Sequence, residues 1–278
     1  MNSPNPSTTP VDSLDWNLAW QEARRRKKSA SSRNNDYWNR RAPSFARHAG
    51  ETSYSHNIIH LLAPKADWSI LDVGCGAGTL ALPLAHMVRQ VTAIDFSEVM
   101  ISILDEKCRE QRLDNVTARV VGWEDDWDAA GIAMHDIAIA SRSLVVEDLR
   151  LALLKLHNIA RRRVVVSSLV GDGPFDRGIF EAIGRQLDRG PDYIYVYNLL
   201  NQMGLLAEVS FVANGDTRKI YSGLEDAVQG FHWMIDNMTP DEESLLRDYL
   251  ARHLVKNGAG WSLTYHHPVR WAVISWWK

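Results

Sequence analysis

The sequence predicts an α/β protein built on a doubly wound, mostly parallel sheet. From residue 69 onward, short apolar strands alternate with helical segments through short linkers, which is typical of a parallel sheet with helices on both faces. A glycine-rich turn joins the first of these strands to the following helix, as expected at the first crossover of such a sheet. Right-handed crossovers then make the sheet doubly wound.

The expected elements follow from the hydrophobic period and from turn residues. We expect strands at 69–73, 90–94, 116–121, 136–140, 163–169 and 207–213, and strand-like runs at 261–265 and 269–276. We expect helices at 12–28, 37–62 with a break near residue 50, 79–89, 97–111, 147–160, 193–203 and 224–254. Ser97 is suited to cap the helix that it begins, because its hydroxyl can accept from a free backbone N–H.

Composition and charge exclude several classes of protein. The chain of 278 residues has a net charge of -3, which gives no bulk attraction to nucleic acid or anionic lipid. No apolar run approaches the roughly 18 residues of a membrane helix, and residues 1–10 lack the pattern of a signal peptide. Cys75 and Cys108 are the two cysteines, and neither has a neighbour at metal-ligand spacing. We therefore expect a cytoplasmic protein without a metal site or a membrane or nucleic-acid partner.

The domain organisation is predicted from changes in the pattern of strands and helices along the chain. Residues 1–35 are expected to form a disordered tail and an N-terminal helix, and residues 36–278 a single large domain. The regular strand–helix alternation ends after residue 169. The segments near 171–190 and 224–260 are therefore interpreted as helical cap insertions in this domain.

The strongest motif lies where the first strand turns into its helix. It reads Leu-Asp-Val-Gly-Cys-Gly-Ala-Gly-Thr over residues 71–79. Gly74 and Gly76 permit backbone angles and close approaches that a Cβ would block, and Gly78 permits close packing of the helix. Asp95 ends the second strand, the place where a carboxylate accepts hydrogen bonds from ribose hydroxyls in this topology.

These motifs resemble those of the class I S-adenosylmethionine-dependent methyltransferases of small-molecule type. Residues 71–78 are similar to motif I of that family, residues 93–97 to its D-x-S segment, and residues 37–42 to an N-terminal helix of many small-molecule members. The resemblance covers roughly residues 37–213. It implies a seven-stranded sheet with the last strand antiparallel, S-adenosylmethionine as cofactor and S-adenosylhomocysteine as product. NAD-binding folds favour Gly-x-Gly-x-x-Gly, a spacing that this sequence lacks.

The resemblance implies a role for each matching residue. Asp72 would lie under the methionine end of the cofactor, and Asp95 would hold the ribose hydroxyls. Trp123 would stack near the adenine, with Glu124 or Asp125 accepting from its amino group. Carried over by position, the implied cofactor-binding residues are Tyr37, Asp72, Gly74, Cys75, Gly76, Gly78, Asp95, Phe96, Trp123, Glu124 and Ser141.

The acceptor is expected to be a small molecule in a pocket above the carboxyl ends of the strands. Methyl transfer from a sulfonium is a direct displacement, so the protein mainly holds the acceptor in line and removes a proton where needed. Ser141 matches the position that faces the sulfonium. Residues 140–144 lack the Asn/Asp-Pro-Pro-Tyr motif of base and amide methylation. His232 and His266 are candidates for a general base, because histidine titrates near neutral pH.

Two alternative functions are left open. The first is a methyltransferase that acts on RNA or protein, which would present a basic or peptide-shaped groove. The second is a regulator that binds S-adenosylmethionine without turnover and has a sealed acceptor face.

Overall fold

The computed structural model describes residues 13–27, 38–39, 42, 52–213, 219–258 and 260–278. They fall into two compact units. We call the part made of residues up to 169, 190–212 and 271–278 the sheet unit, and the part made of residues 170–189 and 213–270 the insertion unit. No helix in these described ranges is long and apolar enough to cross a membrane.

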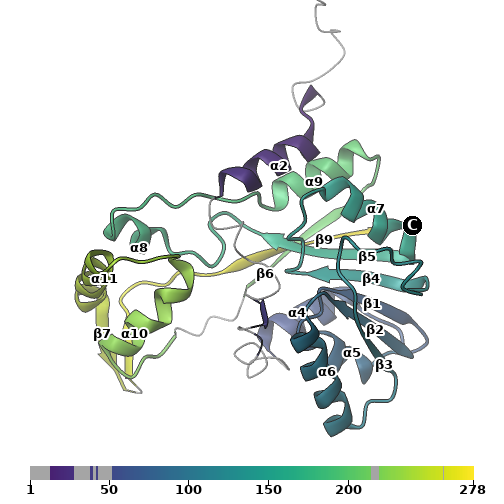
Figure 1. Cartoon of the computed structure of the whole chain (residues 1–278), viewed down its shortest axis with the longest axis horizontal. Coiled ribbons are helices and arrows are strands. Elements are labelled where there is room, and N and C mark those ends of the chain that lie inside the picture. The colour runs from purple at the N-terminus through teal and green to yellow at the C-terminus, as the bar shows by residue number, and fades with distance from the viewer. Residues whose placement is uncertain (1–12, 28–37, 40–41, 43–51, 214–218, 259) are drawn as a thin grey trace, which may run out of the picture. The chain divides into compact units, whose positions relative to one another are not determined.

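The sheet unit contains most of the elements (Figure 1). Its helices are α2 (Trp16–Arg26), α4 (Ser53–Leu62), α5 (Ala81–Ala85), α6 (Glu98–Gln111), α7 (Leu149–Ile159) and α9 (Tyr193–Gln202). Its strands are β1 (Ser69–Val73), β2 (Gln90–Asp95), β3 (Val116–Val120), β4 (His135–Ser141), β5 (Ala160–Leu169), β6 (Glu208–Ala213) and β9 (Arg270–Trp277).

The strands form a seven-stranded sheet in the order β3-β2-β1-β4-β5-β9-β6. Strands β1 to β5 pair in parallel, and β9 pairs antiparallel with β5. This arrangement confirms the predicted fold class, including the antiparallel last strand. The strand order reverses between β1 and β4, and open α/β sheets bind ligands beyond the carboxyl ends of the strands at such a switch point.

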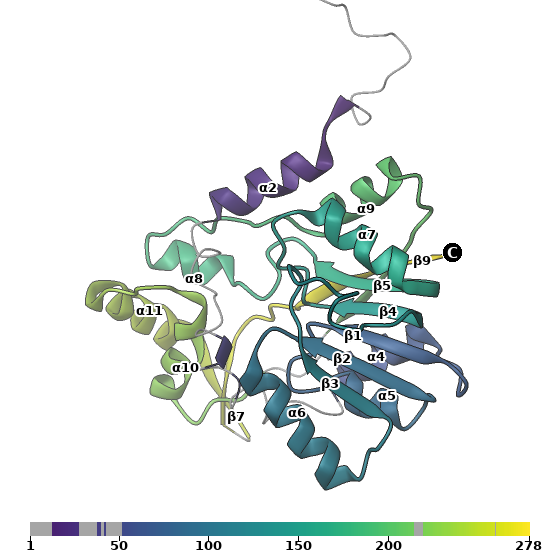
Figure 2. The same ribbon diagram turned by 45° about the vertical axis from the view of Figure 1, so that its right-hand side comes forward.

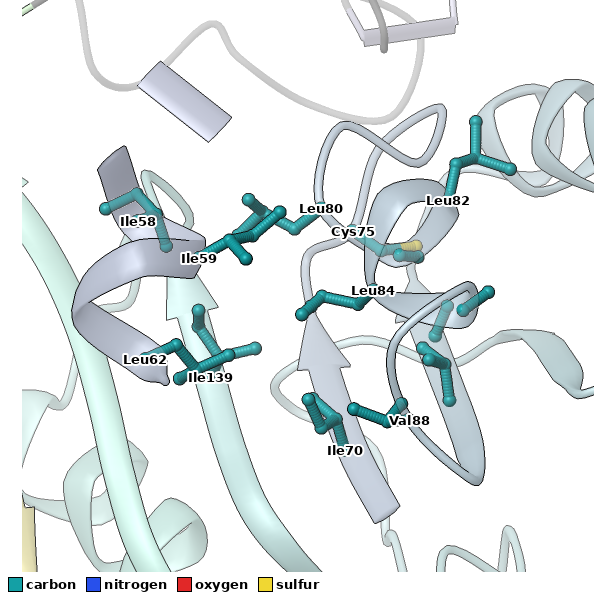
Figure 3. Close-up of a cluster of buried hydrophobic side chains, with 14 of the residues drawn as sticks. Ile58, Ile59, Leu62, Ile70, Cys75, Leu80, Leu82, Leu84, Val88 and Ile139 are labelled. Atoms are coloured by element: carbon teal, nitrogen blue, oxygen red, sulfur yellow. The ribbon is translucent and has the colours of Figure 1, made fainter. Parts of the chain in front are cut away.

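Helices cover both faces of the sheet. Helices α4, α5 and α6 lie on one face and α7 and α9 on the other (Figures 1 and 2). On the first face, Ile58 and Leu62 of α4 share an apolar cluster with Leu84 of α5 and Ile70 of β1 (Figure 3). All five residues of β1 are buried, as expected for a central parallel strand that is covered on both sides.

The helix predicted at 79–89 is the main error in the predicted elements. The α-helix covers only Ala81–Ala85, because residues 76–80 form turns and the helix ends before its C-cap residue His86. The Arg89 N–H then donates to the Trp68 carbonyl oxygen at 3.0 Å, which aligns the chain for β2. The helix predicted at 224–254 is also interrupted, since residues 232–239, which include a 3-10 helix at 232–234, separate its two α-helical parts.

The insertion unit has elements and a core of its own. Its elements are α8 (Arg177–Ala182), α10 (Leu224–Phe231), the 3-10 helix η2 (His232–Met234), α11 (Pro240–His253), β7 (Leu254–Asn257) and β8 (Gly260–Leu263). Strands β7 and β8 form a separate antiparallel pair. Buried side chains of this unit, among them Ile179, Val228, Leu246 and Leu250, form one apolar cluster.

Candidate functional site

Asp95 ties two loops together at the carboxyl end of β2. Its Oδ2 accepts from the Gly76 N–H at 2.9 Å, and its Oδ1 accepts from the Ser97 N–H at 2.9 Å. The side chain is buried, with the residue 7% exposed. A carboxylate oxygen can accept more than one hydrogen bond, so both oxygens keep capacity for a further donor.

The glycine turn is held against β2 and against the loop after β4. The Gly74 and Cys75 N–H groups both donate to the Ile94 carbonyl oxygen, at 2.7 and 3.0 Å. Gly74 has φ 69°, and a Cβ at this position would lie 2.3 Å from the Ser143 Cβ. Ser143 Oγ in turn donates to the Val73 carbonyl oxygen at 2.6 Å. Glycine at 74 is therefore required by both the backbone angle and the contact.

Gly78 permits the close packing that the sequence predicted. A Cβ at this position would lie 2.6 Å from Leu104 Cδ1 of α6 and 2.9 Å from Leu82 Cγ of α5. At Gly76 a Cβ would meet only Met100 Sδ, at 4.0 Å. The backbone N–H of Gly76 faces Asp95, so the turn and the carboxylate form one hydrogen-bonded arrangement.

Asp72 is a carboxyl group inside the central strand β1. The residue is 2% exposed, and burial together with the charge of Asp95 raises the pKa of its carboxyl to about 7. The Ala81 N–H opposes this shift by hydrogen bonding to the carboxyl. The pKa of Asp95 is also raised by burial, against hydrogen bonds from the N–H groups of Ser97, Gly76 and Phe96. Two buried acids thus flank the glycine turn.

The raised pKa of Asp72 predicts a pH-dependent stability. A raised acid pKa means that the folded state binds more protons than the unfolded state between about 3.8 and about 7. The stabilising contribution is complete below this range and is lost as the pH rises through it. Relative to Asp72→Asn, we expect the free energy of unfolding of the wild type to fall by about 2 to 3 kcal/mol from about pH 5 to about pH 8. Urea unfolding at both pH values measures it.

Asp136 provides the control for this experiment. It is also buried, but hydrogen bonds from Ser69 and Arg162 outweigh the effect of burial and lower the pKa of its carboxyl. A lowered pKa places the pH dependence below pH 4. The difference between wild type and Asp136→Asn should therefore be constant over the same range. A constant difference for Asp72→Asn as well would contradict an elevated pKa at Asp72.

Both cysteines are buried in the structure. Cys75 Sγ lies in the apolar cluster on the α4–α5 face of the sheet (Figure 3). The Cys75 N–H donates to the Ile94 carbonyl oxygen at 3.0 Å, and its Sγ donates to the Gly76 carbonyl oxygen at 3.4 Å. Burial raises the pKa of the Cys75 thiol well above its usual value, and burial also raises that of Cys108. Both thiols are thereby held in the protonated, weakly nucleophilic form.

The predicted adenine-side residues lie on loops next to the turn. Phe96 follows Asp95 directly and is 40% exposed, as expected of a ring available to a ligand. The Trp123 indole N–H donates to the Ser143 carbonyl oxygen at 2.9 Å. Glu124 is exposed, whereas Asp125 Oδ2 accepts from the Gly122 N–H at 2.7 Å. Of the two acidic alternatives in this loop, Asp125 is already engaged in holding the loop.

Ser141 belongs to a cluster that the sequence did not predict. The Tyr54 hydroxyl lies 2.7 Å from Ser141 Oγ and 2.8 Å from Ser167 Oγ. The Arg142 guanidinium lies over the Tyr54 ring at 4.1 Å and 5.7 Å from the Trp271 ring centre. These residues come from α4, the ends of β4 and β5, and the start of β9. We call Tyr54, Ser141, Arg142, Ser167 and Trp271 the tyrosine–arginine cluster.

The tyrosine–arginine cluster lies beside the glycine turn. Arg142 stands one residue before Ser143, which contacts Gly74. Burial raises the pKa of the Tyr54 hydroxyl, the charge of Arg142 opposes this, and that of Asp72 adds to it. Tyr54 is therefore neutral near pH 7. One sequence signal was available: Tyr54 precedes Ile58 by four residues, which places it on the buried face of a helix.

Described residues 38 and 39 contact the start of α6 and the glycine turn. Ser97 caps α6 as predicted, with its Oγ accepting from the Met100 N–H at 3.2 Å. The same Oγ donates to Asn39 Oδ1 at 2.6 Å, and Trp38 packs with Ala77 and Met100. Tyr37, one of the implied cofactor-binding residues, lies outside the described residues.

The two candidate bases are in the insertion unit. His232 belongs to η2, with its Nε2 3.7 Å from Glu243 Oε2, and His266 lies between β8 and β9. The donor-side residues are all in the sheet unit. Neither histidine is thus brought together with Asp95 or Ser141 within one unit. Within the described residues, no group of three or more histidine, cysteine or acidic side chains is arranged to hold a metal.

Comparison with known proteins gives matches of three kinds. A family model described as a methyltransferase domain matches residues 70–162. An uncharacterised protein of Haemophilus influenzae is 31% identical over 243 residues, covering 87% of this chain and 88% of that protein. A 23S rRNA (uracil(1939)-C(5))-methyltransferase of Pseudomonas fluorescens is 43% identical over 57 residues, only 20% of this chain and 13% of that protein.

A solved structure agrees with the fold. The crystal structure of a candidate methyltransferase of Bacillus halodurans superimposes with a TM-score of 0.51 at 13% identity, covering 80% of this chain and 96% of that one. The match to the methyltransferase family model includes β1, the glycine turn, β2 and β4. These elements build the site around Asp95. The chain belongs to the class I S-adenosylmethionine-dependent methyltransferases and uses S-adenosylmethionine as its methyl donor.

Proposed function

We propose that this methyltransferase transfers the methyl group to a small-molecule acceptor by direct displacement. The proposal depends on one observation: the donor-side turn and the tyrosine–arginine cluster lie next to each other in the sheet unit. The donor-side turn, held by Asp95, contacts the loop after β4 through Gly74 and Ser143. Ser141 at the end of β4 and Arg142 at the start of that loop both belong to the tyrosine–arginine cluster. A donor and an acceptor can thus be held side by side at the switch point of the sheet.

The residues of the turn fit an adenosyl donor. Asp95 keeps acceptor capacity on both oxygens, which suits a pair of ribose hydroxyls. Asp72, when ionised, places a negative charge near the amino group of the methionine part. Phe96 and Trp123 offer ring surfaces to the adenine, and Glu124 offers a free carboxylate to its amino group. The donor supplies an already activated methyl group when bound.

The chain's own contribution is then positioning. Ser141 Oγ is oriented by the Tyr54 hydroxyl at 2.7 Å, so it presents a fixed dipole at the end of β4. Tyr54 is buried and neutral, which keeps this hydroxyl pair a hydrogen-bonding group and not a charge. Correct placement of two reactants can supply a large share of the rate enhancement of a displacement. The roofing of the acceptor pocket by segments 171–190 and 224–260 stays a prediction.

Three pools of acceptor distinguish the proposed function from its alternatives. The protein is incubated with S-adenosylmethionine labelled in the methyl group and, separately, with small molecules, total RNA and total protein from a bacterial extract. We expect label in the small-molecule pool. Label in RNA or protein alone would overturn the proposed acceptor class. Donor binding by calorimetry without label in any pool would instead favour a non-catalytic regulator.

A further inference from the structure

Arg142 occupies an unusual backbone conformation at the end of β4. Its φ is 58°, in the left-handed region that side chains with a Cβ rarely adopt. Its N–H donates to Ser167 Oγ of β5 at 2.8 Å, and Ser167 Oγ lies 2.8 Å from the Tyr54 hydroxyl. The backbone of Arg142 is thus fixed by the Ser167 hydroxyl, which also contacts the Tyr54 hydroxyl. Strained residues of this kind are concentrated at ligand-binding and active sites.

The guanidinium of Arg142 is placed by aromatic rings and not by an acid. It lies over the Tyr54 ring at 4.1 Å and near the Trp271 ring at 5.7 Å. In the part of the chain that the structure describes, no carboxylate lies within ion-pair distance of Arg142. A cation–π contact of this kind engages the charge of the guanidinium and uses none of its N–H donors.

Other arginines of the chain show the contrast. Arg177 and Arg189 both donate to Asp172, and Arg185 donates to Glu242 at 2.5 and 2.7 Å. Arg142 is instead held by its backbone hydrogen bond and by contacts with two rings. The N–H groups of its guanidinium have no hydrogen-bond acceptor among the described residues. A planar fork of donors held in this way matches the two oxygens of a carboxylate or a phosphate.

We infer that Arg142, seated on Tyr54, binds an anionic group of the methyl acceptor, a carboxylate or a phosphate. The inference rests on the proposed function and names its substrate class. Arg142 follows Ser141 directly and precedes Ser143, which contacts Gly74 of the donor turn. An anion on Arg142 therefore lies beside the donor turn, where it orients the acceptor. Tyr54 acts as a positioning residue, because its ring carries the guanidinium and its hydroxyl orders Ser141 and Ser167.

The first test measures binding without turnover. The protein saturated with S-adenosylhomocysteine is titrated with benzoate, with its neutral analogue benzamide and with inorganic phosphate. The indole N–H signal of Trp271 in NMR, identified by its loss in Trp271→Phe, reports occupancy near the guanidinium. We expect benzoate or phosphate to shift this signal in a saturable way while benzamide does not. A stronger response to benzoate assigns a carboxylate, and a stronger response to phosphate assigns a phosphate.

Four variants and one matched control make this test specific. Arg142→Gln should weaken binding of the anion at least tenfold, and Arg142→Lys, which keeps the charge without the fork, at least threefold. Tyr54→Phe keeps the ring and should retain more anion affinity than Tyr54→Leu, which removes it. Arg112→Gln is the matched control, because Arg112 is exposed, has φ 54° and lies at the end of α6. Equal responses to benzoate and benzamide, no response to either anion, or full affinity in Arg142→Gln would overturn the inference.

The second test identifies the charge of the product. Labelled methyl products from the small-molecule pool are separated on an anion exchanger at neutral pH. Retained label that falls at least tenfold with Arg142→Gln supports the inference. Label in an unretained product would overturn it and leave the proposed function standing. Absence of label from every small molecule would overturn the proposed function and, with it, the assignment of the anion to an acceptor.

Discussion

Gly74→Ala is expected to destabilise the protein strongly and to abolish donor binding. The new Cβ would lie 2.3 Å from the Ser143 Cβ, an atom that no rotamer change can move away. Gly74 also has φ 69°, which costs a residue with a Cβ about 1 to 2 kcal/mol. Overpacking typically adds about 1 to 3 kcal/mol. We therefore expect the free energy of unfolding, measured with urea, to fall by about 2 to 5 kcal/mol.

Gly204→Ala separates the two causes. Gly204 has φ 74°, but a Cβ there would meet nothing within 4 Å. The free energy of unfolding of this variant should fall only by the cost of the backbone conformation, about 1 to 2 kcal/mol. The variant should bind S-adenosylhomocysteine normally. Ser143→Gly in the Gly74→Ala background removes the contact and should restore part of the stability. An equal loss in Gly74→Ala and Gly204→Ala would show that the contact with Ser143 contributes nothing.

Asp95→Ala is expected to weaken donor binding by about 1 to 3 kcal/mol, the range for removing a charged partner from hydrogen bonds. This corresponds to roughly 5- to 150-fold in the dissociation constant. Affinity is lost for two reasons. The variant lacks the oxygens that would accept from the ribose hydroxyls of the methyl donor, and it lacks the two hydrogen bonds, each of 2.9 Å, that hold the N–H groups of Gly76 and Ser97. Calorimetry with S-adenosylhomocysteine measures it.

Asp136→Ala is the matched control for this measurement. Asp136 is likewise buried and accepts from a backbone N–H, that of Ser69 at 2.9 Å. It lies near the start of β4, at the opposite end of the strand from Ser141. Its loss should lower stability while leaving donor affinity unchanged. Unchanged donor affinity in Asp95→Ala would remove Asp95 from the proposed donor site.

The elements that the sequence predicted well are those that depend on local pattern. The strand–turn–helix around the glycines and the cap at Ser97 depend on residues within a few positions of each other. The helix after the turn was predicted too long, since its hydrophobic period does not show where hydrogen bonding changes to turns. Cys75 shows a related limit: it stands inside the motif, but its side chain is turned into the core.

The sequence by itself determined the fold class, the family and the donor turn. These features depend on alternating apolar strands, on the spacing of the glycines and on Asp95, and each of these patterns is formed by residues that are close together in the sequence. Only the tertiary structure decided what lies beside that turn. Tyr54, Arg142, Ser167 and Trp271 come from four separate segments. They meet because sheet order and register place the ends of β4, β5 and β9 next to each other, and pairing between distant strands leaves no local pattern in a single sequence.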